Sequence, residues 1–391
     1  MMGLMAYGLL ATMICLSSMQ DWPTQFGVST AEVQLTLSGF LVAFGGLQIV
    51  YGAASDQFGR KPLLLAGLLV ATIASVLAAL APSMPLLIAA RVLQGAGCAA
   101  GLVLGRAMVQ DYFAGHARTR MMAAVGILLS VTPMLGIMIG GQIHAWLGWR
   151  ANFVLLTLFG AILFVVTWRW MPGAAPQLER SGGRGADFSW RALAVGYARL
   201  LRHPAYRIYA AISFIPNGTF YTVMAGAPFV LSASYGISPE NIAWYIVCLP
   251  LAFMFGSLVA SGLVRRHGHL AVMATGHALG LIGVALVLGL VLSGVNSPLA
   301  LALPLLLVGF GNALFLPSAL VGTVSSVPAL AGSGAGLVGL LQQVNGAFAA
   351  LLTGLIAHDT PVQWGMLMLV WAVLGIAAQC ALPAVTRKAG A

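Results

Sequence analysis

The chain alternates between long apolar runs and short breaks that contain polar residues, glycine or proline. Each run approaches the ~20 residues that a helix needs to cross the hydrocarbon core of a bilayer. Twelve such runs can be followed, at about 3–20, 33–54, 63–81, 85–110, 121–146, 151–171, 206–231, 241–262, 271–292, 299–320, 332–357 and 363–384. This pattern predicts an all-α membrane protein with twelve transmembrane helices.

The composition excludes a water-soluble protein. Apolar residues make up 60% of the 391 residues and charged residues 7%, whereas soluble domains contain roughly 25% charged residues. The excess of 18 Lys and Arg over 8 Asp and Glu would suggest nucleic-acid binding in a soluble chain, but in a membrane protein the positions of the charges matter more than their sum. We therefore expect neither a soluble enzyme nor a nucleic-acid-binding protein.

The basic residues mark one side of the predicted bundle. If the first span leaves the cytoplasm, the loops with clustered Lys and Arg all lie inside, and Arg150 alone lies outside. The internal set comprises Arg60, Lys61, Arg118, Arg120, Arg180, Arg184, Arg191, Arg199, Arg202, Arg265, Arg266, Arg387 and Lys388. By the positive-inside rule, both termini are predicted to be cytoplasmic, in a multi-pass protein of the bacterial inner membrane.

One long polar stretch divides the chain. Residues 173–205 contain five arginines and a Ser-Gly-Gly-Arg-Gly run that starts at Ser181, which is typical of a solvated cytoplasmic linker on an anionic leaflet. The predicted domains are a six-helix bundle over 1–172, this linker, and a second six-helix bundle over 206–391. The sequence has no G-x-x-x-x-G-K-[ST] element and no Cys or His cluster with metal-ligand spacing, so we expect no nucleotide, cofactor or metal.

The loop after the second span carries the pattern G-x-x-x-D-x-x-G-R-K, formed by Gly52, Asp56, Gly59, Arg60 and Lys61. It resembles the loop signature of the major facilitator superfamily, which implies two pseudo-symmetric six-helix bundles. The glycines suit close packing and a tight turn, and Asp56 suits the positive dipole end of a neighbouring helix. Arg60 needs an acid, and Asp111 at the end of the fourth span is the nearest by topology. The resemblance implies that these contacts latch the two halves in the outward-facing state; the alternative is that the charges only mark a cytoplasmic turn.

The fourth span contains Arg91-Val-Leu-Gln94-Gly95-Ala-Gly97, which is similar to the R-x-x-Q-G-x-G motif of the same superfamily. Glycines at 97, 101 and 105 form one stripe that allows another helix to approach. Arg91 lies roughly 10 Å into the span by helical rise, and a guanidinium at that depth is costly unless it faces a cavity or a partner. Arg91 and Gln94 are therefore candidates for a transport or proton-relay role, and the alternative for Arg91 is snorkelling to the outer interface.

The fifth span contains Pro133, Gly136 and Gly140 in a P-x-x-G-x-x-x-G-G pattern. This resembles the pattern of the exporter branch of the superfamily. Pro133 removes one backbone hydrogen bond and bends the helix, and the glycines provide a flat face for pivoting. The turn Gly148-Trp-Arg-Ala-Asn-Phe153 is similar to that of the bicyclomycin-resistance (Bcr/CflA-type) drug:proton antiporters, which implies export of drugs in exchange for protons.

One departure from this resemblance concerns proton coupling. The antiporters place an Asp in the first span, and Met13 occupies the aligned position here. A carboxylate in the cavity is the usual proton carrier, because desolvation raises its pKa towards the working range. Asp21, at the mouth of the first span and biased by Arg91, is the candidate substitute; otherwise it is an interfacial helix-end acid. His277 and His144 are further candidates, although lone intramembrane histidines are more often packing residues.

Two segments suggest the position of a substrate cavity. Pro216-Asn217-Gly218 breaks the seventh span, and Gly309-Phe-Gly311-Asn312 with Pro317 is expected to break the tenth. Interrupted helices at corresponding places of a repeat indicate the central site of a transporter; the alternative is that both are kinks without a ligand. The resemblance assigns spans one, four, seven and ten to the cavity. The candidate hydrogen-bonding side chains are Asn217, Tyr221, Asn312 and Gln342.

Together these features predict a secondary active transporter that exports small amphipathic compounds or drugs across the inner membrane by alternating access. Its expected partners are the small-molecule substrate, a proton as counter-ion and the lipid bilayer, and it is expected to act as a monomer. One alternative is a dedicated exporter of a single endogenous metabolite, either peptide-like or a metallophore. Another is an intramembrane enzyme or lipid-handling protein, for which the spans show no nucleophile with a base and no metal cluster.

Overall fold

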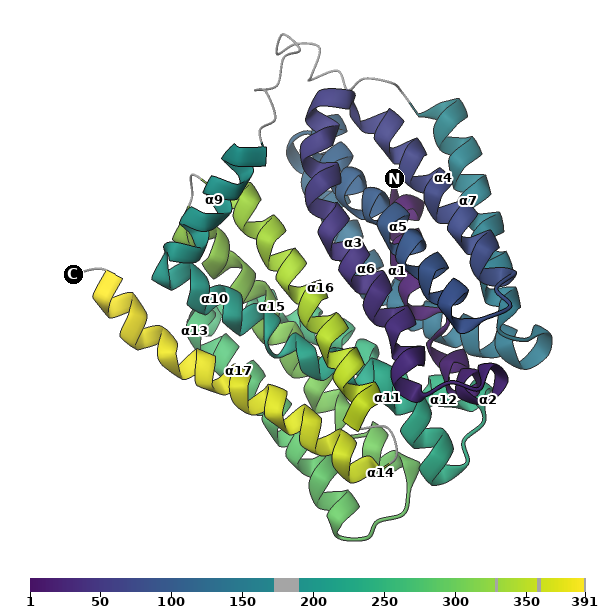
Figure 1. The fold of residues 1–391 in the computed structure, drawn as a ribbon. Coiled ribbons are helices and arrows are strands. Elements are labelled where there is room, and N and C mark those ends of the chain that lie inside the picture. Colours follow the sequence, from purple (N-terminus) through teal and green to yellow (C-terminus); the bar gives the residue numbers. More distant parts are fainter. Residues whose placement is uncertain (172–189, 328–329, 357–359, 390–391) are drawn as a thin grey trace. The chain divides into compact units, whose positions relative to one another are not determined.

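The computed structural model describes residues 1–171, 190–327, 330–356 and 360–389, and every regular element in these ranges is a helix (Figure 1). Helices are expected in so apolar a chain, because a backbone embedded in lipid must satisfy its N–H and C=O groups internally. The chain forms two compact units, Met1–Ser189 and Trp190–Ala391.

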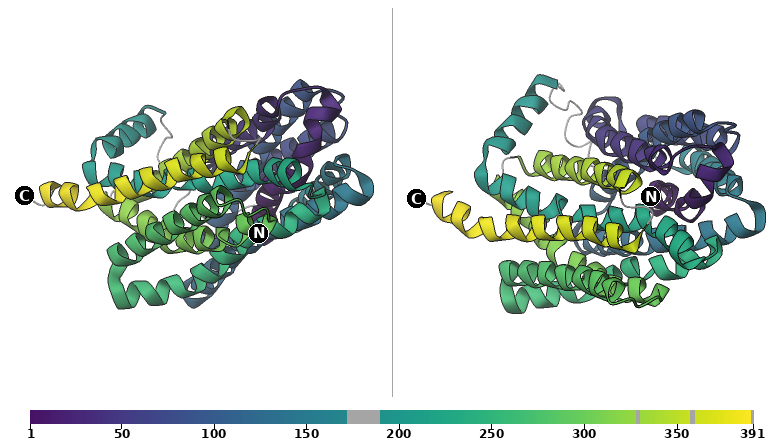
Figure 2. Two further views of the ribbon diagram at one scale, coloured as in Figure 1. Left: turned by 90° about the horizontal axis from the view of Figure 1, so that it is seen from below. Right: turned by 60° about the horizontal axis from the view of Figure 1, so that its bottom comes forward.

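Unit 1 contains six helical spans, of which the first is interrupted. Helix α5 packs against α1, α3 and α4, and Figure 2 shows the ribbon in two further views. A capping box starts α3, since Ser29 Oγ accepts from the Glu32 N–H and the Glu32 carboxylate accepts from the Ser29 N–H. The elements are α1 (Met2–Met13), η1 (Leu16–Asp21), α2 (Trp22–Phe26), α3 (Thr30–Phe58), α4 (Arg60–Ala79), α5 (Met84–Tyr112), α6 (Gly115–Leu147) and α7 (Arg150–Trp170).

Unit 2 also begins its spans with an interrupted helix, and its most extensive packing is between α13 and α15. Helix α13 includes a turn at Gly268, which has φ 80° and ψ 163°. The elements are α9 (Trp190–Arg202), α10 (Pro204–Phe214), α11 (Asn217–Tyr235), α12 (Pro239–Ile246), α13 (Cys248–Leu292), α14 (Pro298–Ala302), α15 (Leu305–Ser326), α16 (Ala331–Ile356) and α17 (Pro361–Ala389).

The spans agree with the number predicted. Ten stretches of the described residues are long and apolar enough to cross a membrane. One of them, Pro239–Leu292, holds two spans, because the turn at Gly268 separates two helices. The interrupted pair α10 and α11 provides a further span. Together these account for the twelve predicted spans, six in each unit.

The helix breaks match the sequence in one case and differ in the other. The seventh span is broken at Ile215 and Pro216, as predicted, between α10 and α11. The tenth is broken between α14 and α15, and α15 runs unbroken through the segment 309–317, so that prediction was wrong. Glycine serves packing there: a Cβ on Gly309 would overlap the Leu249 carbonyl, and one on Gly311 would overlap the carbonyl of Gly276.

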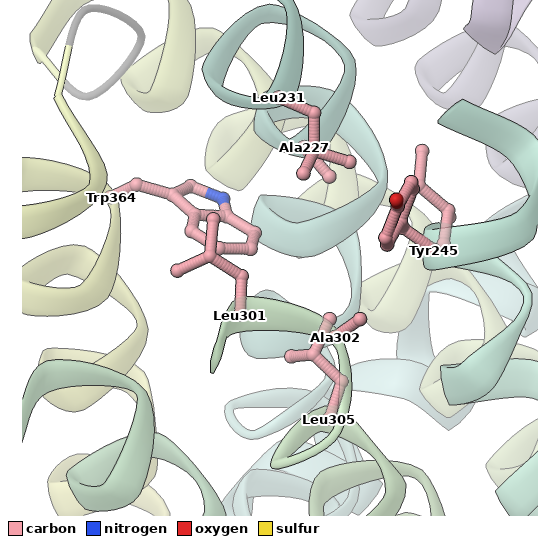
Figure 3. A pocket seen from close by; sticks show the side chains of 8 residues that line it. Ala227, Leu231, Tyr245, Leu301, Ala302, Leu305 and Trp364 are labelled. Atoms are coloured by element: carbon pink, nitrogen blue, oxygen red, sulfur yellow. The ribbon is translucent and has the colours of Figure 1, made fainter. Parts of the chain in front are cut away.

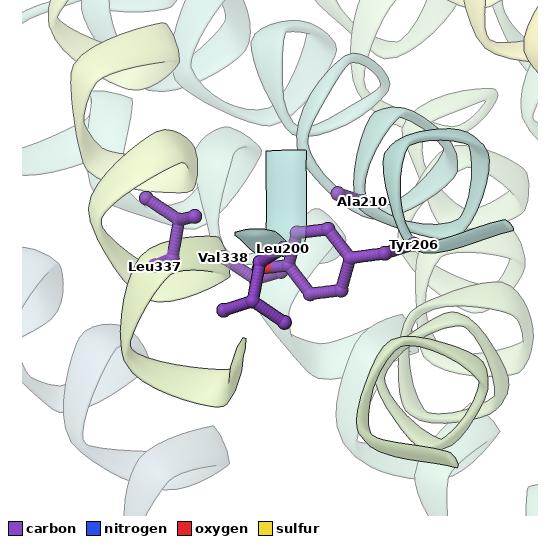
Figure 4. Packing of buried hydrophobic residues seen from close by; sticks show 5 residues of the cluster. All are labelled: Leu200, Tyr206, Ala210, Leu337 and Val338. Atoms are coloured by element: carbon purple, nitrogen blue, oxygen red, sulfur yellow. The ribbon is translucent and has the colours of Figure 1, made fainter. Parts of the chain in front are cut away.

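Part of the segment predicted as a linker forms helix α9 and packs on unit 2 (Figure 4). Leu200 is fully buried against Tyr206 and Val338, in a cluster that α10 and α16 complete. The Tyr206 hydroxyl donates to the Gly334 carbonyl at 2.8 Å. Residues 172–189, which include the preceding part of the predicted linker, lie outside the described residues.

Candidate transport site

The glycines of the fifth span form a flat face on α6 at the point where α1 ends. A Cβ added to Gly140 would overlap the backbone carbonyl of Ile14, and one added to Gly136 would lie 3.1 Å from the Met13 Cβ. Helix α6 continues through Pro133 without a break. The close approach to α1 therefore depends on the two glycines, which form the flat face that the sequence predicted; pivoting upon it stays a prediction.

One helical turn beyond Gly140, α6 brings His144 to the end of η1. The His144 Nε2 lies 2.9 Å from an Asp21 carboxylate oxygen. Only 9% of the His144 side chain is exposed, against 36% of the Asp21 side chain. The sequence singled out these two residues separately and did not predict their contact. The pair brings a carboxylate and an imidazole within hydrogen-bond distance, at the end of unit 1 that is predicted to face outward.

Arg91 is the centre of a buried polar network in unit 1. Its Nη1 donates to the Ala11 carbonyl at 2.8 Å and to Gln94 Oε1 at 2.5 Å. Gln94 Nε2 donates to Ser75 Oγ at 2.7 Å, and the Tyr7 hydroxyl lies 3.2 Å from the same oxygen. All four of these polar side chains are buried. The network ties α5 to α1 and to α4.

The burial of Arg91 excludes one of the two roles predicted for it, and the transport role stays a prediction. The side chain is 0% exposed, so it does not snorkel to the interface. Its Nε and Nη2 have no hydrogen-bond partner among the described residues, and its guanidinium carbon lies 4.4 Å from the centroid of the Phe40 ring. Asp21 is paired with His144 in place of the predicted Arg91.

The glycines of α5 allow two neighbouring helices to approach, whereas the sequence predicted one stripe that admits one helix. Gly97 faces α4, where a Cβ would lie 2.5 Å from the Gly67 carbonyl oxygen. Gly101 and Gly105 face α1, and a Cβ on Gly101 would overlap the Leu4 carbonyl. Because α1 and α4 both come this close to α5, the Arg91 network is closed off between them.

The ion pair that the topology predicted joins Arg60, at the start of α4, to Asp111 of α5. Arg60 contacts the Asp111 carboxylate through Nε, and its Nη2 lies 3.5 Å from Asp111 Oδ1. Its Nη1 donates to Ser55 Oγ at 3.3 Å. Gly59 has φ 83°, a left-handed conformation that suits glycine and makes the tight turn before Arg60.

Other residues of the same loop signature have different roles. Lys61 Nζ donates to the carbonyls of Trp168 at 3.1 Å and Met171 at 2.5 Å, where a cation favours the C-terminal end of α7. A Cβ on Gly52 would meet its nearest neighbour at 3.7 Å, an ordinary contact, so within unit 1 this glycine is not required by close packing. The Asp56 side chain lies outside the described part of the structure, and its contact with a helix dipole stays a prediction.

In unit 2, the polar side chains expected in a cavity are largely bonded to the protein. Asn217 Nδ2 donates to the backbone carbonyl of Gln342 at 3.2 Å. The Tyr221 hydroxyl donates to Gln343 Oε1 at 3.0 Å. The Gln342 Nε2 is buried without a hydrogen-bond partner among the described residues. Asn217 and Tyr221 therefore join α11 to α16, and Gln342 is the one of the three with an unused buried donor.

His277 and Asn312 lie together beside the break in the seventh span. Both line a small cavity of unit 2 that also includes Pro216 and Thr219. The His277 ring stacks on Phe315, with the ring centroids 4.3 Å apart, and its Nε2 has no partner in the described part of the chain. The structure thus brings together two candidates that the sequence placed in different spans.

A second cavity of unit 2 is almost wholly apolar (Figure 3). Trp364, which lines it, donates its Nε1 to the Thr222 carbonyl at 2.9 Å. A site that fixes the orientation of a ligand needs several convergent polar groups. We therefore assign this cavity to packing. Its walls are Ala227, Leu231, Tyr245, Ile246, Leu301, Ala302, Leu305 and Trp364.

Comparison with known proteins decides the family. The family model described as Major Facilitator Superfamily matches residues 1–350. The chain belongs to the major facilitator superfamily. A solved D-xylose-proton symporter has the same fold, with a TM-score of 0.76 over 97% of this chain and 95% of that chain at 16% sequence identity.

Curated relatives of this superfamily member bear drug-resistance names. A chloramphenicol resistance protein of Pseudomonas aeruginosa is 28% identical over 90% of this chain and 83% of its own length. Multidrug resistance protein D of Escherichia coli (strain K12) is 27% identical over 98% and 94%, and a bicyclomycin resistance protein homolog of Haemophilus influenzae is 25% identical over 85% and 82%. The resemblance to Bcr/CflA-type transporters is confirmed, and the chain is a multi-pass transporter rather than an enzyme.

Three buried polar residues of this major facilitator were not singled out from the sequence. Ser75 links Gln94 to Tyr7. Asn152 Nδ2 donates to the Gly140 carbonyl at 3.2 Å. Asn345 Nδ2 donates to the Phe214 carbonyl at 2.7 Å, beside the break where that carbonyl loses its helical partner. A polar residue inside an apolar run was the available signal, since such residues need partners away from water.

Proposed function

We propose that this transporter exports small amphipathic compounds, including drugs, across the bacterial inner membrane in exchange for protons. It acts as a monomer by alternating access, with both termini in the cytoplasm. The observation that carries the proposal is the contact between Asp21 and His144, one helical turn from the close approach of Gly140 to Ile14. The proton-binding groups and the glycine face of the exporter-type segment thus belong to one interface.

The first span of this protein offers a carboxylate at only one place. Met13, at the position of the acid in similar antiporters, is 4% exposed and lies against Gly136. Asp21 is partly exposed and is paired with an imidazole, and carboxylates and imidazoles are the side chains that most often transfer protons in proteins. A shift of α6 against η1 would separate Asp21 from His144. It would also change the side of the membrane from which water reaches their proton.

Few other charges act on this pair. η1 and α2 contain no other charged side chain, and the other titratable residues of α6 lie in its first two turns. Glu32 is engaged in the capping box with Ser29. On α7, Arg150 stacks on Trp149 and donates to a backbone carbonyl at 3.0 Å. The other charges on these elements are therefore either far along the helix or bound to other partners.

The substrate class is supported by the relatives and by the composition. The relatives are named for chloramphenicol, bicyclomycin and multidrug resistance, which indicates compact, partly apolar compounds. The protein contains 17 Met and 17 Phe residues, side chains that adapt to varied apolar surfaces. Export rather than import is supported by the segment from Pro133 to Gly140, which resembles that of the exporter branch.

An Asp21→Asn substitution tests this proposal. Asparagine keeps the shape of the side chain and its contact with His144 but cannot release a proton. We expect substrate to bind to the purified variant, while the proton release that substrate causes in the parent protein falls to background. The measurement follows a pH indicator in weakly buffered detergent solution on addition of chloramphenicol.

Glu32→Gln is the matched control, because it removes a second carboxylate near the same end of unit 1 and an amide can still accept the capping bond. This variant should release protons as the parent does. Undiminished release from Asp21→Asn would exclude Asp21 as the carrier, and loss in both variants would show that the signal is not specific to the Asp21–His144 pair.

A further inference from the structure

Gly59 in unit 1 and Gly268 in unit 2 form turns of similar backbone geometry beside basic residues, and Gly148 of unit 1 shares this geometry. Gly59 in unit 1 has φ 83° and ψ 154°, and Gly268 in unit 2 has φ 80° and ψ 163°. Arg60 follows the first turn, whereas Arg265 precedes and His269 follows the second. The two turns are therefore comparable positions, and the charges around them can be compared directly.

Among the described residues, an acid lies beside the first turn, and the helices at the second turn carry none. Arg60 is paired with Asp111 of α5. Neither α13 nor α15, which meet at the second turn, contains an Asp or Glu. Within the described part of unit 2 the one acid is Glu240, which lies in the first turn of α12 and contacts Ser238. The positive charge of Arg265 thus has no carboxylate on the helices that surround it.

A cavity of about 450 Å³ occupies this position, between α15 and the two parts of α13. Its polar lining includes Arg265, His269, Ser261 and Ser318. The His269 Nδ1 lies 3.2 Å from Ser318 Oγ. Leu314 and Val321 contribute apolar walls, and Val321 is 51% exposed. A volume of this size matches ordinary ligand pockets.

We propose that this cavity binds the phosphate headgroup of an anionic phospholipid from the leaflet predicted to be cytoplasmic. A guanidinium pairs with phosphate through two parallel hydrogen bonds, and hydroxyl groups add further donors. The apolar walls and the exposed Val321 side chain suit the start of an acyl chain, which free phosphate lacks. The inner leaflet supplies such lipids and attracts basic segments. The lipid thus takes the place that Asp111 has in unit 1.

The test compares two adjacent arginines by native mass spectrometry of the delipidated, full-length protein. Arg265 lines the cavity and Arg266 does not, although both are exposed and carry the same charge. Titration with phosphatidylglycerol should give a retained one-lipid species in the parent and in Arg266→Gln. In Arg265→Gln its apparent affinity should fall roughly ten-fold, the value of one charge-assisted contact. Equal loss in both variants, or loss in neither, would overturn the assignment.

Two further arms distinguish the source of the phosphate and the role of the cavity. Phosphatidylcholine should be retained less than phosphatidylglycerol, and inorganic phosphate should not displace the lipid. Ser261→Phe, at an exposed position on the wall, should fill the space and reduce retention as Arg265→Gln does. Displacement by inorganic phosphate would mean a free-anion site, and equal retention of the zwitterionic lipid would contradict the preference for anionic headgroups.

Discussion

Gly140→Ala is expected to abolish transport and to lower the stability of unit 1. The added Cβ would overlap the Ile14 carbonyl, so α1 and α6 must move apart. Overpacking of this kind costs ~1–3 kcal/mol, and the displacement would also disturb the Asp21–His144 pair one turn away. Thermal unfolding of the purified protein and drug resistance in a strain without its own exporters measure the two effects.

Gly126→Ala is the control for this substitution, because it makes the same change in the same helix at a position where a Cβ meets nothing within 4 Å. It should preserve resistance, and the gain in helix propensity should leave stability equal or slightly higher. Full resistance from both variants would show that the close approach of α6 to α1 is not required for transport.

Arg91→Met is expected to reduce transport roughly ten-fold or more, equivalent to ~1.4 kcal/mol, with little loss of stability. Two nitrogens of the guanidinium have no partner among the described residues. Met removes a buried charge that lacks an ionic partner, and the desolvation cost thus avoided offsets the lost bonds to Ala11 and Gln94. A purely structural role would therefore not reduce activity in a well-folded variant.

Arg91→Lys separates charge from geometry at the same position. The guanidinium Nη1 bonds to both Ala11 and Gln94, whereas one ammonium on a shorter side chain cannot reproduce that fork. We expect activity between the parent and Arg91→Met, measured as initial rates in proteoliposomes with protein amount matched. Parent-level rates for both variants would show that Arg91 takes no part in transport.

Local signals in the sequence predicted much of the fold. The twelve spans follow from apolar length, and the break at Pro216 follows from the missing N–H of proline. The signal for the tight turn at Gly59 is also local. Gly309 and Gly311 were misjudged, because glycine can either break a helix or admit a neighbour, and only the position of α13 decides between them. Helix α9 was concealed by the polar composition of the segment around it.

The candidate site depended on contacts that the sequence does not encode locally. Arg60 and Asp111 could be matched because both are charged and at the same side of the predicted topology. The contact between Asp21 and His144 depends on how α6 crosses η1, which no spacing reveals. The bond of Asn217 to Gln342 likewise depends on the packing of α11 against α16. Sequence thus identified the polar residues, and tertiary packing determined their partners.

Proton-driven movement of substrate is the central claim. The direct test uses proteoliposomes with an acidic interior and an alkaline exterior, and a compound to which the protein gives resistance in cells. The parent protein should accumulate the compound inside above its external concentration, as protons leave, and a protonophore should abolish the accumulation. Simple equilibration of the compound at the same rate with and without the pH gradient would contradict proton antiport.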